Sequence, residues 1–526
     1  MALLIPASPA HASPCFPGCL QGSLSDSLDF LSSGPLGQAE VAALVTTVDR
    51  GDTLVSIQPE RRLIPGSNVK LFTTGSFLKR YGVNYRRPTL LLARGKASPQ
   101  KDGTEIRFKG DLVLRASGMP DVYQLLSPGS RGLLDSLAFL LRAGGVTRFQ
   151  GTVWIDGSVF ASESYGPGWG HDDFAYAYGA PINAVLANGN ATTLIATSTP
   201  RGVTYQFDPP EVSLVARGRP TVGNAGTPGH LDVSRAPGSR VLEVIGTVPR
   251  GGMVKRQVAV VDPDSTAGLM LLGAMKRMGI EVDASVRVLK PADEATAADV
   301  ERMEGLAGSP ADSAAGASAR GWTAVDAGRV TGVVSLLSPP ASDVVGIVNA
   351  MSLNAEAEAL LRLLDPASSG KQRERGLVEL MRIVGESGVD TVDLSLVDGS
   401  GLSPMDLATP RAIVTWLRSL DRDPEIGPAF RAGLARPGAL GTLKNRFGVL
   451  DTKADLHGKT GTLTNVSALS GFVTRADGER TIFSILSNGN RNSVSYARDA
   501  EEKLVSLLAR TSLTPEPTSA PIGIPR

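Results

Sequence analysis

The sequence predicts a multidomain protein of the α+β and α/β classes, in which one helix-and-sheet domain is interrupted by a large strand-rich insertion. At 526 residues the chain is too long for a single compact core. Amphipathic helices and alternating strands occur before residue 87 and resume after residue 340. Short strands and turns dominate between these positions, so we expect an insertion into one domain.

The first part of the helix-and-sheet domain is predicted as a hairpin followed by a helix. Glu40–Asp49 and Thr53–Gln58 alternate in polarity on either side of an Asp-Arg-Gly-Asp turn. Apolar positions then recur at helical spacing over Val69–Tyr81. The hairpin is thus expected to lead straight into this helix.

The insertion is predicted to mix short strands with two helices. Strands are expected over Glu105–Lys109, Asp111–Leu114 and Gly151–Asp156, and a helix over Gly132–Ala143. Val258–Val261, Ser265–Met278 and Ile280–Val288 predict a strand–helix–strand unit.

After residue 340 helices and strands alternate again. Propensity favours one uninterrupted helix over Met351–Leu364, and further helices over Gln372–Glu386, Pro410–Leu420 and Arg498–Ala509. Strands are expected from Leu456 and over Ala468–Thr474 and Arg480–Ser487.

These patterns divide the chain into an interrupted helix-and-sheet domain, an insertion and irregular segments. The helix-and-sheet domain takes residues 21–86 and 340–510, and the insertion, expected to form two accessory domains, takes residues 87–290. Residues 291–320, rich in Ala, Asp, Ser and Gly, are expected to be a flexible linker, and residues 511–526 a disordered tail.

Composition and charge exclude several classes of protein. The net charge of +1 provides no basic field for nucleic acid, and no apolar run is long enough for a transmembrane helix. The hydrophobic content of 42% is ordinary for a soluble globular chain. No cofactor motif and no metal-binding pattern such as H-E-x-x-H is present.

The N-terminal residues 1–20 resemble part of an export signal. Ala10-His-Ala12 suits a cleavage site, but the apolar core is short and a basic leader is missing. A start codon placed too far downstream and a chain that is not exported both explain this, and we favour export. Cys15 and Cys19 are the only cysteines; they suit a small disulfide in an oxidising compartment but not a zinc site.

A serine and a lysine three residues apart form the first candidate chemical pair. Ser67 opens the Val69–Tyr81 helix after a Pro-Gly turn, and Lys70 shares its helical face. A lysine can act as the base for a serine only if its pKa falls, and burial beside a second cation lowers it. Ser67 as an ordinary helix cap is the competing interpretation. Ser76/Lys79, Ser98/Lys101 and Ser368/Lys371 have the same spacing, but none of them opens a helix.

Two further fragments complete a known constellation. Ser352-x-Asn354 and Lys459-Thr460-Gly461 follow Ser67-x-x-Lys70 in the order S-x-x-K, S-x-N, K-T-G that is typical of penicillin-recognising serine enzymes. Lys459 is the predicted second cation beside Lys70.

The chain resembles the low-molecular-mass class C penicillin-binding proteins, which are D-alanyl-D-alanine carboxypeptidases and endopeptidases. Besides the three motifs, the matching stretches begin at Gly110, Gly168, Asp398, Gly441 and Gly458, and the likeness runs from about residue 30 to 510. Leu353, which replaces a polar residue inside S-x-N, is a departure. The resemblance implies a transpeptidase-like (β-lactamase-like) domain with an antiparallel sheet flanked by helices, and a two-domain insertion.

The resemblance also implies a mechanism and a substrate. Ser67 would attack the carbonyl of a D-Ala-D-Xaa bond in a peptidoglycan peptide after Lys70 takes its proton. The implied roles of the other motif residues are proton relay and substrate contact, by Ser352, Asn354, Lys459, Thr460, Gly461 and Thr462. The backbone N–H groups of Ser67 and Thr462 would form the oxyanion hole. No cofactor is implied.

In the insertion, the family resemblance implies an aspartate that meets the amino end of the peptide's diamino acid. The candidates for this and for nearby substrate contacts are Asp172, Asp173, Trp169 and Tyr176. Packing of an aromatic-rich loop on its own domain is the competing interpretation of this stretch. β-Lactams would be inhibitors, and a wall substrate places the protein in the periplasm or cell envelope.

Two rival functions use the same scaffold. A β-lactamase or esterase would need a positioned deacylating water, and the chain lacks Glu-x-x-Leu-Asn and is long for that class. A non-catalytic wall-binding protein is disfavoured by the full set of catalytic groups. The preference for carboxypeptidase or endopeptidase, the diamino acid and the oligomeric state are left open by the sequence.

Overall fold

The computed structural model describes most of the helix-and-sheet region and most of the insertion. The described residues are 39–100, 103–160, 163–289, 320–323, 332–365, 371–448, 455–490 and 494–510. The predictions for residues 1–20, Cys15 and Cys19, residues 291–319 of the linker, and the tail 511–526 lie outside these ranges.

A five-stranded antiparallel sheet joins the two ends of the chain. Its order is β18 (Leu456–Leu463), β19 (Val466–Thr474), β20 (Arg480–Asn488), β1 (Glu40–Thr47) and β2 (Thr53–Ile57). β1 pairs with β20 along its whole length, from Glu40 opposite Asn488 to Thr47 opposite Thr481. The N-terminal hairpin therefore completes a sheet whose other strands come from the far end of the chain.

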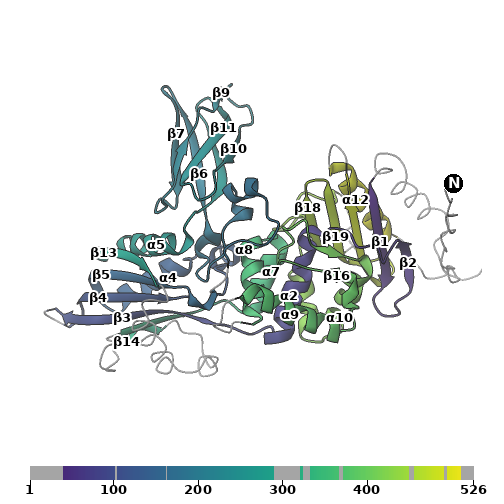
Figure 1. Cartoon of the computed structure of the whole chain (residues 1–526), viewed down its shortest axis with the longest axis horizontal. Coiled ribbons are helices and arrows are strands. Elements are labelled where there is room, and N and C mark those ends of the chain that lie inside the picture. The colour runs from purple at the N-terminus through teal and green to yellow at the C-terminus, as the bar shows by residue number, and fades with distance from the viewer. Residues whose placement is uncertain are drawn as a thin grey trace, which may run out of the picture.

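Helices cover both faces of this sheet (Figure 1). In β1, Ala42 and Leu44 belong to one buried cluster, whereas Ala43 and Val45 belong to a second cluster with α12 (Ser495–Arg510). Because successive strand residues point to opposite faces, β1 is buried on both sides. The layer opposite α12 consists of α2 (Val69–Tyr81), α7 (Ala341–Met351), α8 (Asn354–Leu363), α9 (Gln372–Glu386), α10 (Pro410–Asp421) and α11 (Ile426–Ala432).

A six-stranded mixed sheet is the largest element of the inserted region. Its order is β13 (Glu281–Val288), β5 (Val146–Asp156), β4 (Ile106–Arg115), β3 (Pro88–Pro99), β15 (Gly332–Leu337) and β14 (Arg320–Thr323). Two helices, α4 (Leu133–Ala143) and α5 (Pro263–Arg277), pack on one face around Phe108, Phe149 and Leu271.

β4 corrects the prediction of two short strands over 105–109 and 111–114. Gly110, which the sequence interpretation treated as a break, lies opposite Gly95 and Gly151 in the neighbouring strands. A Cβ atom at Gly110 would lie 2.1 Å from the Arg94 carbonyl oxygen. The glycines thus let three strand backbones approach closely within one continuous ladder.

Two smaller sheets project away from the six-stranded sheet (Figure 1). One contains β12 (Met253–Ala259), β6 (Ala191–Thr199) and β7 (Gly202–Asp208), and the other β10 (His230–Ser234), β11 (Val241–Pro249), β8 (Val215–Arg217) and β9 (Thr221–Gly223). β12 and β13 therefore lie in different sheets, so the predicted strand–helix–strand unit connects two sheets instead of forming one.

The fold class is confirmed, since an antiparallel sheet flanked by helices is combined with a strand-rich insertion. β15 adds a strand from beyond residue 290 to the insertion's sheet by pairing with β3. The division into domains at the predicted boundaries stays a prediction.

Candidate active site

Ser67 and Lys70 lie side by side where the first helix begins. A single 3-10 turn, Gly66–Asn68, precedes α2, and no side chain caps the start of either the turn or the helix. The Lys70 Nζ donates to the Ser67 Oγ at 2.9 Å. The hydroxyl of Ser67 thus faces the lysine, which disfavours the interpretation of Ser67 as an ordinary helix cap.

Lys70 is fully buried and held by three oxygens. Besides Ser67, its Nζ donates to the Asn354 Oδ1 at 2.6 Å and to the Ser400 carbonyl oxygen at 2.6 Å. Three donors of an ammonium group are thereby matched to three acceptors in a fixed arrangement.

Burial lowers the pKa of Lys70 from 10.5 to about 8, while the charges of nearby carboxylates oppose that shift. The opposing groups, in order of effect, are Asp398, Glu358, Glu356 and Asp406. The pKa of Lys459 lies well below its ordinary value, because of burial first and the charge of Lys70 second. The sequence interpretation expected burial beside a second cation, Lys459, to lower the Lys70 pKa; burial is the largest cause, and the strongest charges acting on Lys70 are carboxylates that raise its pKa.

Ser352 and Asn354 stand at a break between two helices. α7 ends at Met351, Ser352 adopts the left-handed conformation with φ of 60°, and α8 begins at Asn354. The predicted uninterrupted helix over Met351–Leu364 is therefore wrong. A non-glycine residue in this conformation costs about 1–3 kcal/mol, and such strain clusters at functional sites.

Because of this break, the side chains of Ser352 and Asn354 contact different partners. The Ser352 Oγ accepts from the Lys459 Nζ at 2.8 Å. The Asn354 amide accepts from Lys70 and donates from its Nδ2 to the Tyr178 carbonyl oxygen at 2.8 Å. Ser352 and Asn354 thus connect the lysines of the first and third motifs.

The Lys459-Thr460-Gly461 motif lies on β18, at the end of the five-stranded sheet. Lys459 is fully buried, and its Nζ also donates to the Thr460 carbonyl oxygen at 2.8 Å. The Thr460 hydroxyl donates to Thr442 at 2.9 Å. Thr462 is exposed, and its hydroxyl accepts from Arg498 at 3.2 Å.

The backbones of the first and third motifs touch. Gly66 has a φ of 50°, and a Cβ atom there would lie 3.1 Å from the Thr462 nitrogen. A Cβ atom at Gly461 would lie 2.4 Å from the Pro65 carbonyl oxygen. Only glycines permit this approach, which brings the main chain at Ser67 next to that at Thr462.

The turn that begins at Asp398 also borders the site, beside the first and third motifs. The sequence identified this turn only as part of the family resemblance. The Asp398 carboxylate is fully buried and accepts from the backbone N–H groups of Ser400, Gly401 and Ser403 at 2.6–3.0 Å. The turn presents the Ser400 carbonyl oxygen to Lys70. A Cβ atom at Gly401 would lie 1.9 Å from the Gly66 carbonyl oxygen, so the turn also abuts the main chain before Ser67.

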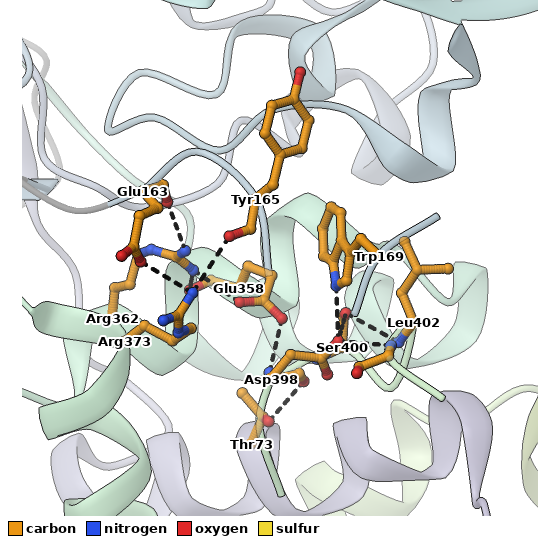
Figure 2. Close-up of polar contacts among 12 residues, drawn as sticks. Thr73, Glu163, Tyr165, Trp169, Glu358, Arg362, Arg373, Asp398, Ser400 and Leu402 are labelled. Atoms are coloured by element: carbon orange, nitrogen blue, oxygen red, sulfur yellow. Dashed lines mark hydrogen bonds and ion pairs between the residues drawn. The ribbon is translucent and has the colours of Figure 1, made fainter. Parts of the chain in front are cut away.

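A buried ion pair supports this turn from α8. Glu358 and Arg362 are both fully buried and lie 2.8 Å apart. The Glu358 Oε1 also accepts from the Gly399 N–H at 2.7 Å, and the Thr73 hydroxyl donates to the Gly399 carbonyl oxygen at 2.7 Å. Figure 2 shows these contacts around Asp398. The i,i+4 spacing of Glu358 and Arg362 in the sequence equally suits an exposed helix pair, so burial was the missing information.

The four predicted residues of the insertion fall into different surroundings. Trp169 is buried, and its indole N–H donates to Asp398 at 2.9 Å. Asp173 accepts from the Tyr178 hydroxyl at 3.0 Å, whereas Asp172 is exposed. The Tyr176 ring stacks on Tyr178, with centroids 5.4 Å apart.

No metal site or membrane helix accompanies these groups in the described part of the chain. Those residues contain no cluster of three or more His, Cys, Asp or Glu side chains that could hold a metal ion. Among them, no helix combines the length and hydropathy that a membrane crossing requires.

The geometry agrees with the comparison with known families. The model of the D-Ala-D-Ala carboxypeptidase 3 (S13) family matches residues 24–303 and 323–511. The chain belongs to this family. It is thus a serine-type D-alanyl-D-alanine carboxypeptidase, as the sequence predicted.

Similar proteins extend over almost the whole chain. The D-alanyl-D-alanine carboxypeptidase of Actinomadura sp. (strain R39) is 28% identical over 518 residues, which cover 94% of this chain and 86% of that relative. The D-alanyl-D-alanine carboxypeptidase DacB of Haemophilus influenzae is 23% identical, over 86% of each chain.

A solved structure confirms the shared fold. The crystal structure of penicillin binding protein 4 (dacB) from Haemophilus influenzae matches with a TM-score of 0.67 and 20% identity, covering 93% of this chain and 100% of that one. The same protein complexed with a β-lactam matches with a TM-score of 0.65 at 19% identity, again over 93% of this chain and 100% of that one.

Proposed function

We propose that Ser67 is the nucleophile of a D-alanyl-D-alanine peptidase that acts on peptidoglycan stem peptides through an acyl-enzyme. The observation that supports this most directly is the 2.9 Å contact between the Ser67 Oγ and the Nζ of a fully buried lysine. A lysine with a pKa of about 8 is neutral often enough near neutral pH to accept a proton from the hydroxyl.

In the acylation step, the Oγ of Ser67 forms a bond to the carbonyl carbon of the penultimate D-alanine. Its proton passes to the Nζ of Lys70. The bond from that carbon to the terminal residue's nitrogen breaks, and the nitrogen receives a proton from Lys70 by way of Ser352. The contact of the Ser352 Oγ with the Lys459 Nζ at 2.8 Å supports this relay, because it fixes the hydroxyl within the site.

The remaining motif residues bind the substrate. The N–H groups of Ser67 and Thr462 stabilise the negative charge on the carbonyl oxygen, and loss of such a donor typically costs a hundredfold or more in rate. Lys459 and Thr462 face the terminal carboxylate, while Thr460 and Gly461 present the edge of β18 to the peptide. The Asn354 amide has a second N–H, which meets the substrate amide.

Water then attacks the ester carbonyl carbon, with Lys70 or Ser352 taking its proton. The bond from that carbon to the Ser67 Oγ breaks, the Oγ receives the proton, and the shortened peptide leaves. A β-lactam acylates Ser67 in the same way through its strained amide. Because the β-lactam ring opens without losing a leaving group, the adduct persists and inhibits the enzyme. The β-lactam complex of the Haemophilus influenzae protein concerns that protein, and its shared fold supports the same chemistry for this chain.

Asp172 is the better of the two predicted aspartates for the amino group of the diamino acid. Its side chain is exposed, whereas Asp173 is engaged by the Tyr178 hydroxyl. Tyr176, stacked on Tyr178 near this stretch, contributes an apolar contact for the aliphatic part of the same residue. Since stem peptides lie outside the cytoplasm, we place the protein in the periplasm or cell envelope.

Replacement of Ser67 by alanine tests this function. Ser67→Ala should lower the release of D-alanine from a D-Ala-D-Ala peptide about a thousandfold or more, because the nucleophile is lost. Ser76→Ala is a matched control, since Ser76 has the same S-x-x-K spacing and its buried hydroxyl has no partner in the described part of the structure. D-Alanine release that survives in Ser67→Ala would refute the proposal.

A further inference from the structure

The segment between Glu163 and Tyr178 belongs to the inserted region, yet it contacts Asn354 and Asp398 in the site around Lys70. At one end the Glu163 and Tyr165 carbonyl oxygens accept from Arg362 and Arg373 at 3.1 and 3.3 Å. Figure 2 shows these two contacts on the far side of Glu358 from Trp169. The segment is therefore fixed to α8 and α9 before it reaches the site.

The middle of the segment reaches the Asp398 turn. Trp169 packs with Ala355 and Ala359 of α8 and with Leu402, and its indole Nε1 donates to the Asp398 Oδ2 at 2.9 Å. The same oxygen accepts from the Ser403 N–H, while Oδ1 accepts from Ser400 and Gly401. The Ser400 hydroxyl also donates to Oδ2, at 3.3 Å, so the indole N–H is the donor that the inserted segment adds to those of the turn itself.

The turn that Asp398 fixes also contacts Lys70. The Ser400 carbonyl oxygen lies 2.6 Å from the Lys70 Nζ, and Asp398 is the charge that acts most strongly on Lys70. The last part of the segment supports the other side, because the Tyr178 carbonyl oxygen holds the Asn354 amide whose Oδ1 lies 2.6 Å from Lys70. Two of the three acceptors around the lysine therefore depend on this one segment.

We infer that Trp169 is a positioning residue for acylation: its indole N–H fixes the Asp398 carboxylate, and the Asp398 turn in turn holds Lys70 against Ser67. This role differs from the substrate contact predicted for Trp169 from the sequence. It rests on the proposed function, in which Lys70 accepts the proton of Ser67.

A substitution that removes only the N–H tests the inference. Trp169→Phe should slow acylation by benzylpenicillin and by a D-Ala-D-Ala peptide to a similar extent, about tenfold, since a hydrogen bond to a charged group is lost. The apparent KM for the peptide should change little. A residue that merely lines the peptide site would raise KM for the peptide and leave acylation by the small β-lactam unchanged.

The pH dependence provides a readout that a purely structural role would not move. The charged and titratable groups around Lys70 are Asp398, Glu358, Glu356, Asp406 and Lys459. The indole N–H places the positive end of a dipole on Asp398, so its removal strengthens the negative field at Lys70. The pKa of Lys70 should therefore rise in Trp169→Phe, and the acidic limb of the pH–rate profile, where acylation falls off at low pH, should move to higher pH.

Trp154→Phe is a matched control. Trp154 lies on β5 in the inserted sheet, and its indole nitrogen has no hydrogen-bond partner in the described part of the structure. This variant should acylate at the wild-type rate with an unshifted pH limb.

If Trp169→Phe does not fold, benzothienylalanine at position 169 keeps the shape of the indole and replaces N–H by sulfur. It should give the same tenfold loss and the same shift. Wild-type rate and pH limb in either variant, or a loss confined to the peptide KM, would overturn the inference. Absence of a Ser67 adduct in the wild-type enzyme would instead refute the proposed function, so the two failures are distinguishable.

Discussion

At the scale of single residues, the chemistry depends on how Lys70 is buried. The fully buried amine makes three short contacts, and its pKa falls to about 8 against the opposing charge of four carboxylates. Because the unfolded chain retains the ordinary lysine pKa of 10.5, it binds more protons than the folded chain between about pH 8 and 10.5. Protonated Lys70 therefore destabilises the fold below pH 8, and this penalty disappears as the pH rises through that window.

Glu356→Gln tests the electrostatic balance around Lys70. Glu356 is buried, with its pKa raised by burial to about 7, and its charge raises the Lys70 pKa. Its neutral replacement should lower the Lys70 pKa and move the acidic limb of acylation toward lower pH, by up to about one unit.

The measurement is the pH profile of the rate of acylation by benzylpenicillin, over about two pH units on either side of neutrality. Glu281→Gln is the control, since its side chain is exposed on β13 of the insertion. An acidic limb that stays in place in Glu356→Gln, or that moves to higher pH, would contradict the account of Lys70.

The motif spacings were sufficient to predict which residues meet in the site. Ser67 lies beside Lys70, as the three-residue spacing predicted, whereas the contact of Ser352 with Lys459 was not predicted. Burial of Lys70 was expected from the chemistry, but the carboxylates that oppose the lowering of its pKa were not predictable, because their positions are a property of the assembled fold. For the same reason Asp398 and Glu358, whose roles depend on burial, were missed as functional residues.

At the scale of secondary-structure elements, regular periodicity predicted the bounds of helices well. It did not predict where the backbone adopts a special conformation. α2 spans Val69–Tyr81 and α9 spans Gln372–Glu386, both with the predicted bounds. The break at Ser352 was not predicted, because local propensity favours a helix through Met351–Leu364 and only tertiary contacts hold Ser352 in the left-handed region. The Lys459 contact to the Ser352 hydroxyl is one such contact.

Two substitutions at Ser352 separate the backbone from the chemistry. Both Ser352→Gly and Ser352→Ala remove the hydroxyl and should slow acylation similarly. Glycine adopts a φ of 60° without strain, so Ser352→Gly should exceed Ser352→Ala in free energy of unfolding by about 1 kcal/mol.

Urea unfolding followed by circular dichroism measures this difference. Equal stability of the two variants would mean that the left-handed conformation at residue 352 is not retained in solution. Equal acylation by wild-type enzyme and both variants would remove Ser352 from the proposed relay.

At the scale of the whole molecule, the insertion and the helix-and-sheet region meet in a packed junction. A Cβ atom at Gly118, which has a φ of 78°, would lie 2.9 Å from the Phe160 ring and 3.0 Å from the Leu363 side chain of α8. Phe160 packs against the main helical cluster, the cluster of the inserted sheet and the Trp169 cluster. The insertion is therefore coupled to α8 by side-chain packing as well as by the Glu163–Tyr178 segment.

Gly118→Ala tests this junction. Overpacking against Phe160 and Leu363 should add about 1–3 kcal/mol of destabilisation to the strain of alanine at positive φ. Gly129→Ala is the matched control, since its φ of 86° is similar and no atom lies within 4 Å of the added Cβ.

The free energies of unfolding of the two variants should thus differ by the packing cost alone, as measured by urea denaturation. Equal losses of unfolding free energy in the two variants would show that Phe160 and Leu363 move aside without an energetic penalty. The insertion would then not be tightly packed on α8.

The arrangement of the insertion was the least predictable part of the fold. Individual strands were recognised from their alternation, but β12 and β13 lie in different sheets and β15 comes from beyond residue 290. Sheet membership depends on long-range pairing, which a local pattern does not encode.

The most direct test of the central claim is to label the wild-type protein with benzylpenicillin, digest it and locate the adduct by mass spectrometry. The account predicts a single penicilloyl group on the peptide that contains Ser67, present in Ser76→Ala and absent in Ser67→Ala. A folded protein that forms no adduct, or that forms it on another serine, would contradict the account.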